Sequence, residues 1–544
     1  MSVARSSLIM ASGTIISRVL GFVRAVLLAA MIGVTTNAAD AFGVANQLPN
    51  NVYAIIAGGV LNAVLVPQIV KARAHIDGGK AYIDRLLTLA IVIFGSITVL
   101  ATLAAPLLVG LYTSGWTANQ LALATAFAYW CLPQLFFYGV YSMLGEVLNA
   151  RSAFGPYMWA PVLNNVVGLA GMVAYIVIFG FDPTGLNGNW GAGQISLLAG
   201  AATAGVASQA LILFVAWKRI GLHFKLNFKW RGFGLRPAAK AGAWTLAMVL
   251  VTQIAGVFQS SVASSAVQGR TSVAVASVAA SGIAWLIFML PHSVATVSLA
   301  TVYFTRISEH ASKNDMFNVK RDLKDGLLTV ALISILSGTA LIVLAYPVSR
   351  VFVGEHPANL ALGNVLIAFM VGLLPFSIGF FLQKAFYSLE DTRTPFWITV
   401  VQSALFIIGA ILIQQSTAAE FRVAALALLT STGVTIQAVL GYALLRKKIG
   451  AFGEGLIPSM LRFGAAALVG AGLGYLVLQG LGGSSASSYA LSSVLAAVLS
   501  SALTGAVILL GFVVTLWAIR APEFTLLRNL ATPVISRVRG IIGR

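Results

Sequence analysis

The chain has 544 residues, of which 59% are hydrophobic and only 9% are charged. Charged residues make up about 25% of a typical soluble protein, so this composition excludes a soluble globular fold. A net charge of +19 would suggest a nucleic-acid partner in a soluble protein, but here the basic residues lie in short loops between apolar stretches. The composition therefore indicates an integral membrane protein that does not bind nucleic acid.

Apolar stretches separated by charged or Gly/Ser/Asn-rich breaks predict an all-α protein with about fourteen transmembrane helices, since a bilayer requires roughly 20 apolar residues per helix. Two stretches without a charged residue, 86–145 and 463–519, are too long for one helix, and each is interrupted once by turn-forming residues. Each therefore forms a helical hairpin. The expected helices are 7–33, 41–69, 86–111, 121–148, 156–180, 191–217, 238–264, 272–305, 326–349, 358–386, 395–415, 422–445, 459–480 and 489–519.

The basic residues also predict the orientation of the chain. When the loops are assigned alternately to two sides, 29 of the 34 Lys and Arg residues lie on one side. The opposite side holds Arg270, Arg350 and Arg422, and the remaining two arginines lie inside the first helix. The positive-inside rule therefore places both termini in the cytoplasm.

A weak internal similarity predicts two halves. Segments 149–156 and 388–395 occupy equivalent places, where a short cytoplasmic turn leads into a helix with proline in its first turn. Transporters built from repeats bind their substrate between the halves, near the middle of the membrane. The predicted parts are six-helix bundles at 1–218 and 237–448, an interfacial connector at 219–236, an extra helix pair at 449–519 and a basic cytoplasmic tail at 520–544.

The sequence lacks the signatures of a catalyst. Its five His residues have no metal-ligand spacing, it has no P-loop, and nearly all of its 15 acidic residues lie in loops. The single cysteine, Cys131, lies in an apolar stretch and is expected to be an inert buried thiol. We therefore expect a transporter with no catalytic residues, no metal and no cofactor.

Two arginines, Arg18 and Arg24, lie within the first predicted helix. Arg18 follows Arg5 by thirteen residues, or about 20 Å of helix, which places it near the bilayer centre. A charge at this depth costs at least about 2.5–3.5 kcal/mol, so we favour a water-filled anion site over snorkelling or a structural ion pair. Because a guanidinium group binds phosphate through paired hydrogen bonds, a phosphorylated substrate is expected.

Three charged side chains near the helix ends are further candidates for substrate binding or for a gate. Asp40 opens the second helix, where it can cap that helix or pair with Arg24 with equal plausibility. Glu146 and Arg151 lie at the cytoplasmic end of the fourth helix, and we favour an ion pair at the rim over a gate.

Prolines inside predicted helices can supply the bends that a transporter needs, and Pro49 and Pro291 are the candidates for a gate. His292, next to Pro291, is expected to be a hydrogen-bonded helix residue and not a proton carrier. The helices of the second half carry no Asp or Glu in their cores, which argues against a standard antiport site there. The membrane potential, worth about 2.3 kcal/mol per charge per 100 mV, is an alternative driving force.

The run Ser17-Arg-Val-Leu-Gly-Phe-Val-Arg24 resembles the MurJ/MviN family of lipid II flippases, within the multidrug, oligosaccharidyl-lipid and polysaccharide (MOP) exporter superfamily. Segments that support the resemblance are 39–42, 48–50, 57–59, 66–67, 148–156 and 386–395. The resemblance implies a flippase of the bacterial cytoplasmic membrane. Such a protein moves undecaprenyl-diphosphate-linked peptidoglycan precursor (lipid II) to the outer leaflet by alternating access, for cell-wall synthesis. The resemblance implies that Arg18 and Arg24 match the family's essential cavity arginines. With Ser17, Asp40 and Asn50 from the matching segments, they are the candidate substrate-binding residues.

The resemblance also implies that the last helix pair forms a groove for the lipid tail.

The sequence departs from the family pattern at several positions. Ala25 replaces an Asp, Tyr53-Ala54 replace a basic pair, Gly58 replaces an acid, and no arginine precedes Pro291 in the eighth helix. The predicted cavity is therefore less cationic than in those relatives.

Three other functions are compatible with many transmembrane helices. An exporter of another lipid-linked oligosaccharide or of drugs shares the fold, but an exporter of hydrophobic cations should prefer acids to arginines in its cavity. A scaffold that recruits cell-wall synthesis proteins without transport would need larger loops, and a membrane glycosyltransferase would need a larger acidic loop. The expected partners are thus lipid II or a related polyprenyl-diphosphate glycolipid, membrane lipids and, as an open alternative, cell-wall synthesis proteins.

Overall fold

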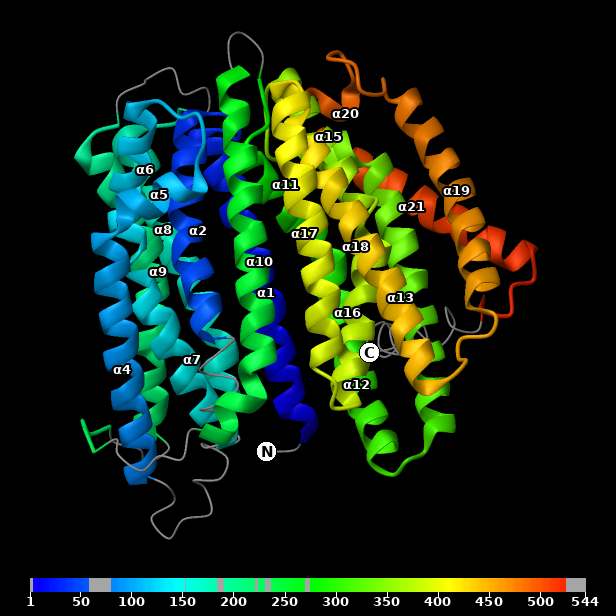
Figure 1. Cartoon of the computed structure of the whole chain (residues 1–544). Helices are drawn as coiled ribbons and strands as arrows, with labels where there is room; N and C mark the ends of the chain where they lie inside the picture. The colour runs from blue at the N-terminus through cyan, green and yellow to red at the C-terminus, as the bar shows by residue number, and fades with distance from the viewer. Residues whose placement is uncertain are drawn as a thin grey trace, which may run out of the picture. The chain divides into compact units, whose positions relative to one another are not determined.

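The computed structural model describes residues 3–57, 80–151, 153–182, 190–219, 221, 224–229, 236–269 and 274–524. Throughout these residues the regular elements are helices (Figure 1), as the composition predicts. The chain forms two compact units. The first comprises Met1–Gly282 with Ala410–Arg422, and the second comprises Ile283–Gly409 with Val423–Arg544. This division follows contacts and not repeats, so the two six-helix halves remain a prediction.

The first unit contains nine α-helices within the described residues. They are α1 (Val3–Ile32), α2 (Asn37–Ile56), α4 (Lys80–Leu103), α5 (Ala105–Tyr112), α6 (Ala118–Cys131), α7 (Gln134–Ala150), α8 (Phe154–Phe179), α9 (Ala192–Arg219) and α10 (Arg236–Ser265).

The second unit begins within α11 and holds the rest of the chain. Its helices are α11 (Val278–Pro291), the π-helical turn η3 (His292–Thr296), α12 (Val297–Ser312), α13 (Met316–Val343), α14 (Ala345–Arg350), α15 (His356–Met370), α16 (Leu373–Ser388), α17 (Arg393–Ser416), α18 (Ala419–Ile449), α19 (Leu456–Gly480), α20 (Tyr489–Ser492) and α21 (Val494–Ala518).

The membrane-spanning character of these helices agrees with the sequence. In the described part of the chain, 12 helical segments are long and apolar enough to cross a membrane, and the pair α15–α16, bent by 43°, gives up to 13. The predicted helix 41–69 is described only as far as residue 57. The count of fourteen and the cytoplasmic position of both termini therefore remain predictions.

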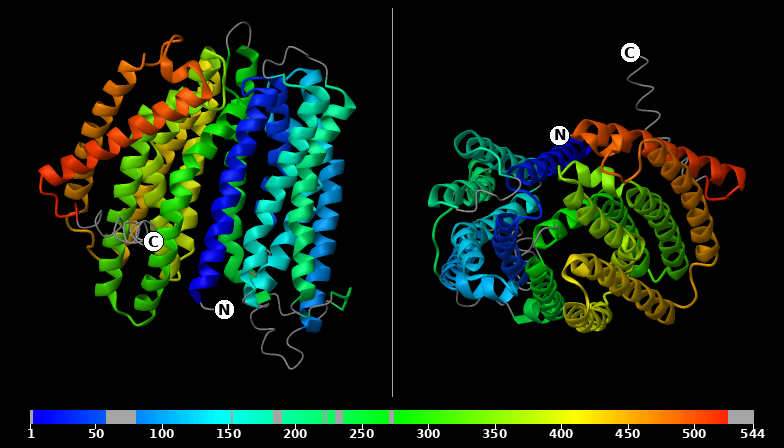
Figure 2. Two further views of the ribbon diagram at one scale, coloured as in Figure 1. Left: turned by 180° about the vertical axis from the view of Figure 1, so that it is seen from behind. Right: turned by 90° about the horizontal axis from the view of Figure 1, so that it is seen from above.

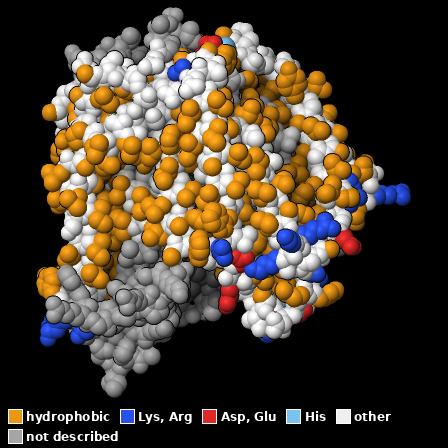
Figure 3. All heavy atoms as spheres, viewed as in Figure 1, with side chains coloured by type: hydrophobic (Ala, Val, Ile, Leu, Met, Phe, Trp, Pro, Cys, Tyr) orange, Lys and Arg blue, Asp and Glu red, His pale blue; other side chains and the backbone are white. Residues whose placement is uncertain are grey.

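The surface fits a lipid environment. Large apolar side chains are strongly exposed on both units, for example Leu107 at 74% in the first and Leu476 at 66% in the second. On the face shown in Figure 3, hydrophobic side chains spread over the helices, whereas Lys and Arg side chains gather toward one end. Exposed apolar area of this extent would be unfavourable in water and is what a bilayer requires.

In the first unit, α1 and α8 pack in parallel. Gly13 lies against Trp159, where an added Cβ would come within 2.9 Å of the indole ring. Further along both helices, Asn165 Nδ2 donates to the Ser17 carbonyl at 2.8 Å. This parallel packing fixes which side chains of α1 face the interior of the unit.

The turn between α17 and α18 belongs to the first unit by its contacts. Arg422 Nη1 donates a hydrogen bond to the Ser265 carbonyl at 3.1 Å. This bond supplies a partner for a carbonyl group at the C-terminal end of α10, which has none within the helix. Gln414 Nε2 donates to Ser114 Oγ, in the turn between α5 and α6, at 3.4 Å. The predicted orientation places this turn on the outer side of the membrane.

In the second unit, α21 crosses α19 obliquely, as both views in Figure 2 show. Glycines allow the close approach of the two backbones, because a Cβ at Gly470 would lie 2.5 Å from the Ile508 carbonyl oxygen. Beyond α21, Glu523 accepts hydrogen bonds from Arg462 and Ser459 at the start of α19. The last helix pair is therefore joined both at its crossing and at its end.

Candidate substrate-binding site

Arg24 lies on α1 with its guanidinium group against the backbone of α8. A Cβ at Gly168 would lie 3.1 Å from Arg24 Cζ and 3.3 Å from Nη1, so glycine leaves the space that the guanidinium occupies. The side chain is half-buried. This contact lies three residues along α8 and seven along α1 from the contact of Asn165 with Ser17, so the parallel packing of the two helices determines the position of this charge.

In the part of the chain that the structure describes, Arg24 forms no ion pair with a carboxylate. Its electrostatic neighbours are the Tyr138 hydroxyl and the Cys131 thiol. A guanidinium group held within the span of a membrane without a counter-ion is costly, and such residues usually mark a substrate path. This arrangement is suited to binding an anion.

A polar network extends from Tyr138 across the first unit. Tyr138 Oη donates to Gln134 Oε1 at 3.2 Å, and Gln134 Nε2 donates to Asn46 Oδ1 and to Thr203 Oγ1, both at 3.2 Å. None of these four residues was among the site residues predicted from the sequence. Their signal was the recurrence of polar side chains one helical turn apart, at Gln134 and Tyr138, within an apolar helix.

The other residues predicted on α1 and α2 differ in their surroundings. Ser17 receives hydrogen bonds from Asn165 at both its carbonyl and its hydroxyl oxygen. The Arg18 side chain is half-buried, and the Asn50 side chain is exposed. Binding of substrate by Ser17, Arg18 and Asn50 therefore remains a prediction, with Ser17 engaged in helix packing.

Asp40 neither caps its own helix nor pairs with Arg24, and its binding of substrate remains a prediction. Thr36, and not Asp40, caps α2 by accepting from the Ala39 N–H at 3.1 Å. Asp40 is fully buried, and its Oδ1 accepts from the backbone N–H of Ala279, in the first turn of α11, at 2.9 Å. The expectation that Asp40 caps its own helix is therefore wrong, and the carboxylate forms no ion pair with Arg24.

The predicted ion pair between Glu146 and Arg151 is also wrong. Both residues are described, and no ion pair joins them. The physical reason is their spacing, because five residues at about 100° per residue place two side chains roughly 140° apart around a helix. Glu146 instead lies in electrostatic range of the Tyr53 and Tyr157 hydroxyls.

The two candidate gate prolines lie inside helices, as predicted. Pro49 is buried in α2, and Pro291 ends α11 and is followed directly by the π-helical turn η3. His292 is buried, with its Nδ1 3.0 Å from Ser377 Oγ and its ring 4.6 Å from that of Phe376. The prediction that His292 is a hydrogen-bonded helix residue is confirmed, and the gating role of the prolines remains a prediction.

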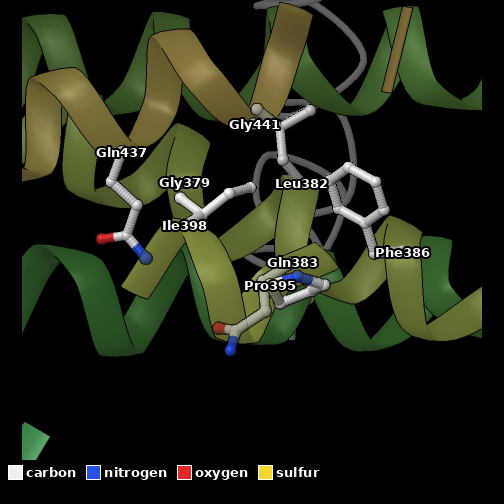
Figure 4. Close-up of a pocket in the computed structure, with 8 residues that line it drawn as sticks. All are labelled: Gly379, Leu382, Gln383, Phe386, Pro395, Ile398, Gln437 and Gly441. Atoms are coloured by element: carbon white, nitrogen blue, oxygen red, sulfur yellow. The ribbon is translucent and has the colours of Figure 1, made fainter. Parts of the chain in front are cut away.

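The second unit contains a small pocket of a different character. Figure 4 shows its lining, which comes from α16, α17 and α18 and consists of Gly379, Leu382, Gln383, Phe386, Pro395, Ile398, Gln437 and Gly441. Two amides are its only polar side chains, and one of them, Gln383, donates to the Tyr387 hydroxyl at 2.9 Å. Without a cation in its lining, this pocket is not suited to a diphosphate.

Across the described residues, no group of three or more His, Cys, Asp or Glu side chains is arranged to hold a metal ion.

The fold defines a multi-pass helical membrane protein, and its first helix carries an arginine that has no carboxylate partner among the described residues. Residues 28–519 match the family model of the lipid II flippase MurJ. The chain therefore belongs to the lipid II flippase MurJ family, whose members are transporters and not enzymes.

Curated relatives agree with this assignment. The chain is 26% identical over 415 residues to a probable lipid II flippase MurJ of Rickettsia prowazekii strain Madrid E, covering 74% of this chain and 76% of the relative. It is 27% identical over 421 residues to the corresponding protein of Rhizobium tropici, covering 74% of each chain. Together with the apolar helices, these bacterial relatives identify a multi-pass protein of the bacterial cytoplasmic membrane.

Solved structures show the same fold. A lipid II flippase MurJ in an inward closed conformation aligns with a TM-score of 0.70 at 20% identity, over 92% of this chain and 98% of that one. A multidrug resistance MATE family transporter of the MOP superfamily, in an inward-facing conformation, aligns with a TM-score of 0.60 at 17% identity, over 79% of this chain and 98% of that one.

Proposed function

We propose that this chain moves lipid II from the inner to the outer leaflet by alternating access, and that Arg24 binds the diphosphate of the substrate with help from Arg18. Family membership supports the substrate class. The observation that supports the binding role is the guanidinium of Arg24, which lies on the glycine backbone of α8 without a carboxylate partner in the described part of the chain.

The electrostatics favour this function over export of cationic drugs. A cavity for hydrophobic cations would place carboxylates where the substrate binds, whereas the charged group at this site is a guanidinium. A diphosphate supplies the counter-charge that the membrane does not, and it can accept paired hydrogen bonds from the guanidinium. Substrate binding would thus relieve the electrostatic cost of Arg24.

Growth of cells depleted of their own lipid II flippase tests the proposal. We expect the wild-type chain to restore growth and Arg24→Ala to fail, at equal abundance in the membrane. Arg446→Ala is a matched control, because Arg446 is exposed in the last turn of α18, and it should restore growth like the wild type.

The outcomes separate the two parts of the proposal. If Arg24→Ala also restored growth, the role of Arg24 would be wrong while the flippase function stood. If the wild type failed despite confirmed insertion, the substrate would be a different polyprenyl-linked lipid, and direct binding of purified lipid II would decide the question.

A further inference from the structure

A carboxylate without a partner faces a group of tyrosines in the first unit. Glu146 is half-buried on α7, and in the described part of the chain its carboxylate takes part in no hydrogen bond or ion pair. The groups in electrostatic range of it are the hydroxyls of Tyr53 on α2 and Tyr157 on α8. A half-buried carboxylate is costly without a cation beside it, so among the described residues Glu146 lacks the partner that a cationic ligand would supply.

Helix packing holds the two tyrosines beside Glu146. A Cβ at Gly145 would lie 2.1 Å from Tyr157 Cε2, so the ring of Tyr157 rests directly on the glycine that precedes Glu146. The ring of Tyr141, one turn earlier on α7, stacks on Tyr157 with centroids 4.9 Å apart, and its hydroxyl donates to the Tyr157 carbonyl at 3.1 Å. Tyr157 is thereby fixed in position.

Tyr53 connects this group to the arginine site. Its hydroxyl lies beside that of Ser142, one helical turn before Glu146, and its ring lies 5.7 Å from the ring of Tyr138. Tyr138 is in turn the electrostatic neighbour of Arg24. Tyr138, Ser142 and Glu146 follow one another at intervals of four residues along one face of α7, so Glu146 lies about 12 Å further along this helix than Tyr138.

We propose that Glu146, Tyr53 and Tyr157 form a subsite that binds a primary ammonium group in the headgroup of the substrate while Arg24 binds its diphosphate. A carboxylate gives a charge-assisted hydrogen bond to an ammonium group, and tyrosine rings attract a cation through their faces. This inference rests on the proposed function, because it assigns a second contact to the same substrate. A substrate that carries both a phosphate and an amine matches the two charges of the site.

Binding of two lipids to the purified, full-length protein tests the subsite. One is lipid II with lysine in its peptide, and the other is the same lipid with the lysine Nε acetylated, which removes the charge. We expect the wild type to bind the lysine form on the order of tenfold more tightly, as a charge-assisted hydrogen bond implies. Glu146→Gln should bind both forms with the affinity of the wild type for the acetylated lipid.

Glu454→Gln is the control for this substitution, since Glu454 is exposed in the loop before α19, and it should keep the preference for the lysine form. Equal binding of the two lipids by the wild type would overturn the subsite and leave the flippase function intact, and this comparison requires no variant to fold. A preference retained in Glu146→Gln would also overturn it. Absence of binding of either lipid to the wild type would overturn the proposed function, and the subsite with it.

Discussion

The carboxylate of Asp40 binds the backbone of Ala279, which is 239 residues away in the sequence, with an Oδ1–N distance of 2.9 Å. Ser277, which precedes α11, donates its hydroxyl to the Ala263 carbonyl at 3.1 Å, and among the described residues its hydroxyl accepts no hydrogen bond from the first turn of the helix. Asp40 therefore supplies from α2 the acceptor that a helix normally obtains from its own N-cap residue.

Asp40→Ala should lower the stability of the protein by about 1–2 kcal/mol, because it removes this cap and leaves a buried N–H without an acceptor. Asp40→Asn keeps the oxygen acceptor and should be much closer to the wild type. Thermal unfolding in detergent measures both. If Asp40→Asn were as stable as the wild type but did not bind substrate, the charge of Asp40 would have a functional role beyond capping.

Gly168→Ala should weaken lipid II binding without unfolding the protein, because the added methyl group would lie 3.1 Å from Arg24 Cζ and displace the guanidinium. Gly256→Ala, on α10, meets no atom within 4 Å and serves as the control. Binding of lipid II to the purified variants is the measurement. Unchanged affinity in Gly168→Ala would mean that the present position of Arg24 is not the one that binds substrate.

Gly470→Ala should destabilise the last helix pair by about 1–3 kcal/mol, because the new Cβ would lie 2.5 Å from the Ile508 carbonyl oxygen and force α19 and α21 apart. Gly472→Ala, two residues along the same helix, meets no atom within 4 Å and should be neutral or slightly stabilising. Thermal unfolding of the two variants compares them directly. Equal stability would contradict the close crossing.

The contact between Gln414 and Ser114 offers a test of alternating access. We expect a Ser114→Cys/Gln414→Cys protein to lose transport when a short bifunctional thiol reagent joins the two residues, since their side chains lie 3.4 Å apart. A cleavable reagent should restore transport on reduction. The only native cysteine, Cys131, is buried and should not interfere. Full transport by the cross-linked protein would show that this contact does not open during the cycle.

The segment after α21 should detach from α19 in acid. Burial alone would raise the pKa of Glu523, but hydrogen bonds from Arg462 and Ser459 outweigh it and hold the pKa below its ordinary value of 4.5. The stabilisation is therefore present above pH 4.5 and is lost as the pH falls through the lower pKa of the folded protein. Hydrogen exchange at residues 519–524 should rise at low pH in the wild type, whereas Glu523→Gln should exchange quickly already at pH 7. A pH-independent wild type would contradict this role.

The sequence alone predicted the helices well because composition and bilayer thickness nearly determine them. The predicted segments that lie within the described residues are largely helical, although some, such as 86–111 and 358–386, are each divided into two helices. The depth argument concerned Arg18, which is half-buried on α1. What could not be predicted is the partner of each polar side chain. Asp40 binds the end of a helix far along the chain, and a local pattern contains no information about that contact.

The tyrosines around Glu146 show the same limit. In the sequence, Tyr141 and Tyr157 look like ordinary aromatic residues of membrane helices, and Tyr53 is noted only as replacing a basic residue of the family pattern. Their grouping depends on how α2, α7 and α8 pack, and on Gly145, whose missing side chain admits the ring of Tyr157. The error at Glu146 and Arg151, by contrast, was avoidable, since helical geometry already separates residues five positions apart.

The π-helical turn at His292–Thr296 has a consequence for how mutations in this span will behave. Because the Val297 N–H bonds to the His292 carbonyl, the turn holds one residue more than an α-helical turn. A helical wheel drawn continuously from α11 into α12 is therefore out of phase by about 100° beyond the turn. Deleting one residue within the turn would remove the extra residue and restore a continuous α-helix, so Arg306 of α12 should stay beside Asp322, its partner at 2.5 Å, whereas deleting a residue of α12 itself before Arg306 should turn Arg306 by about 100° away from Asp322.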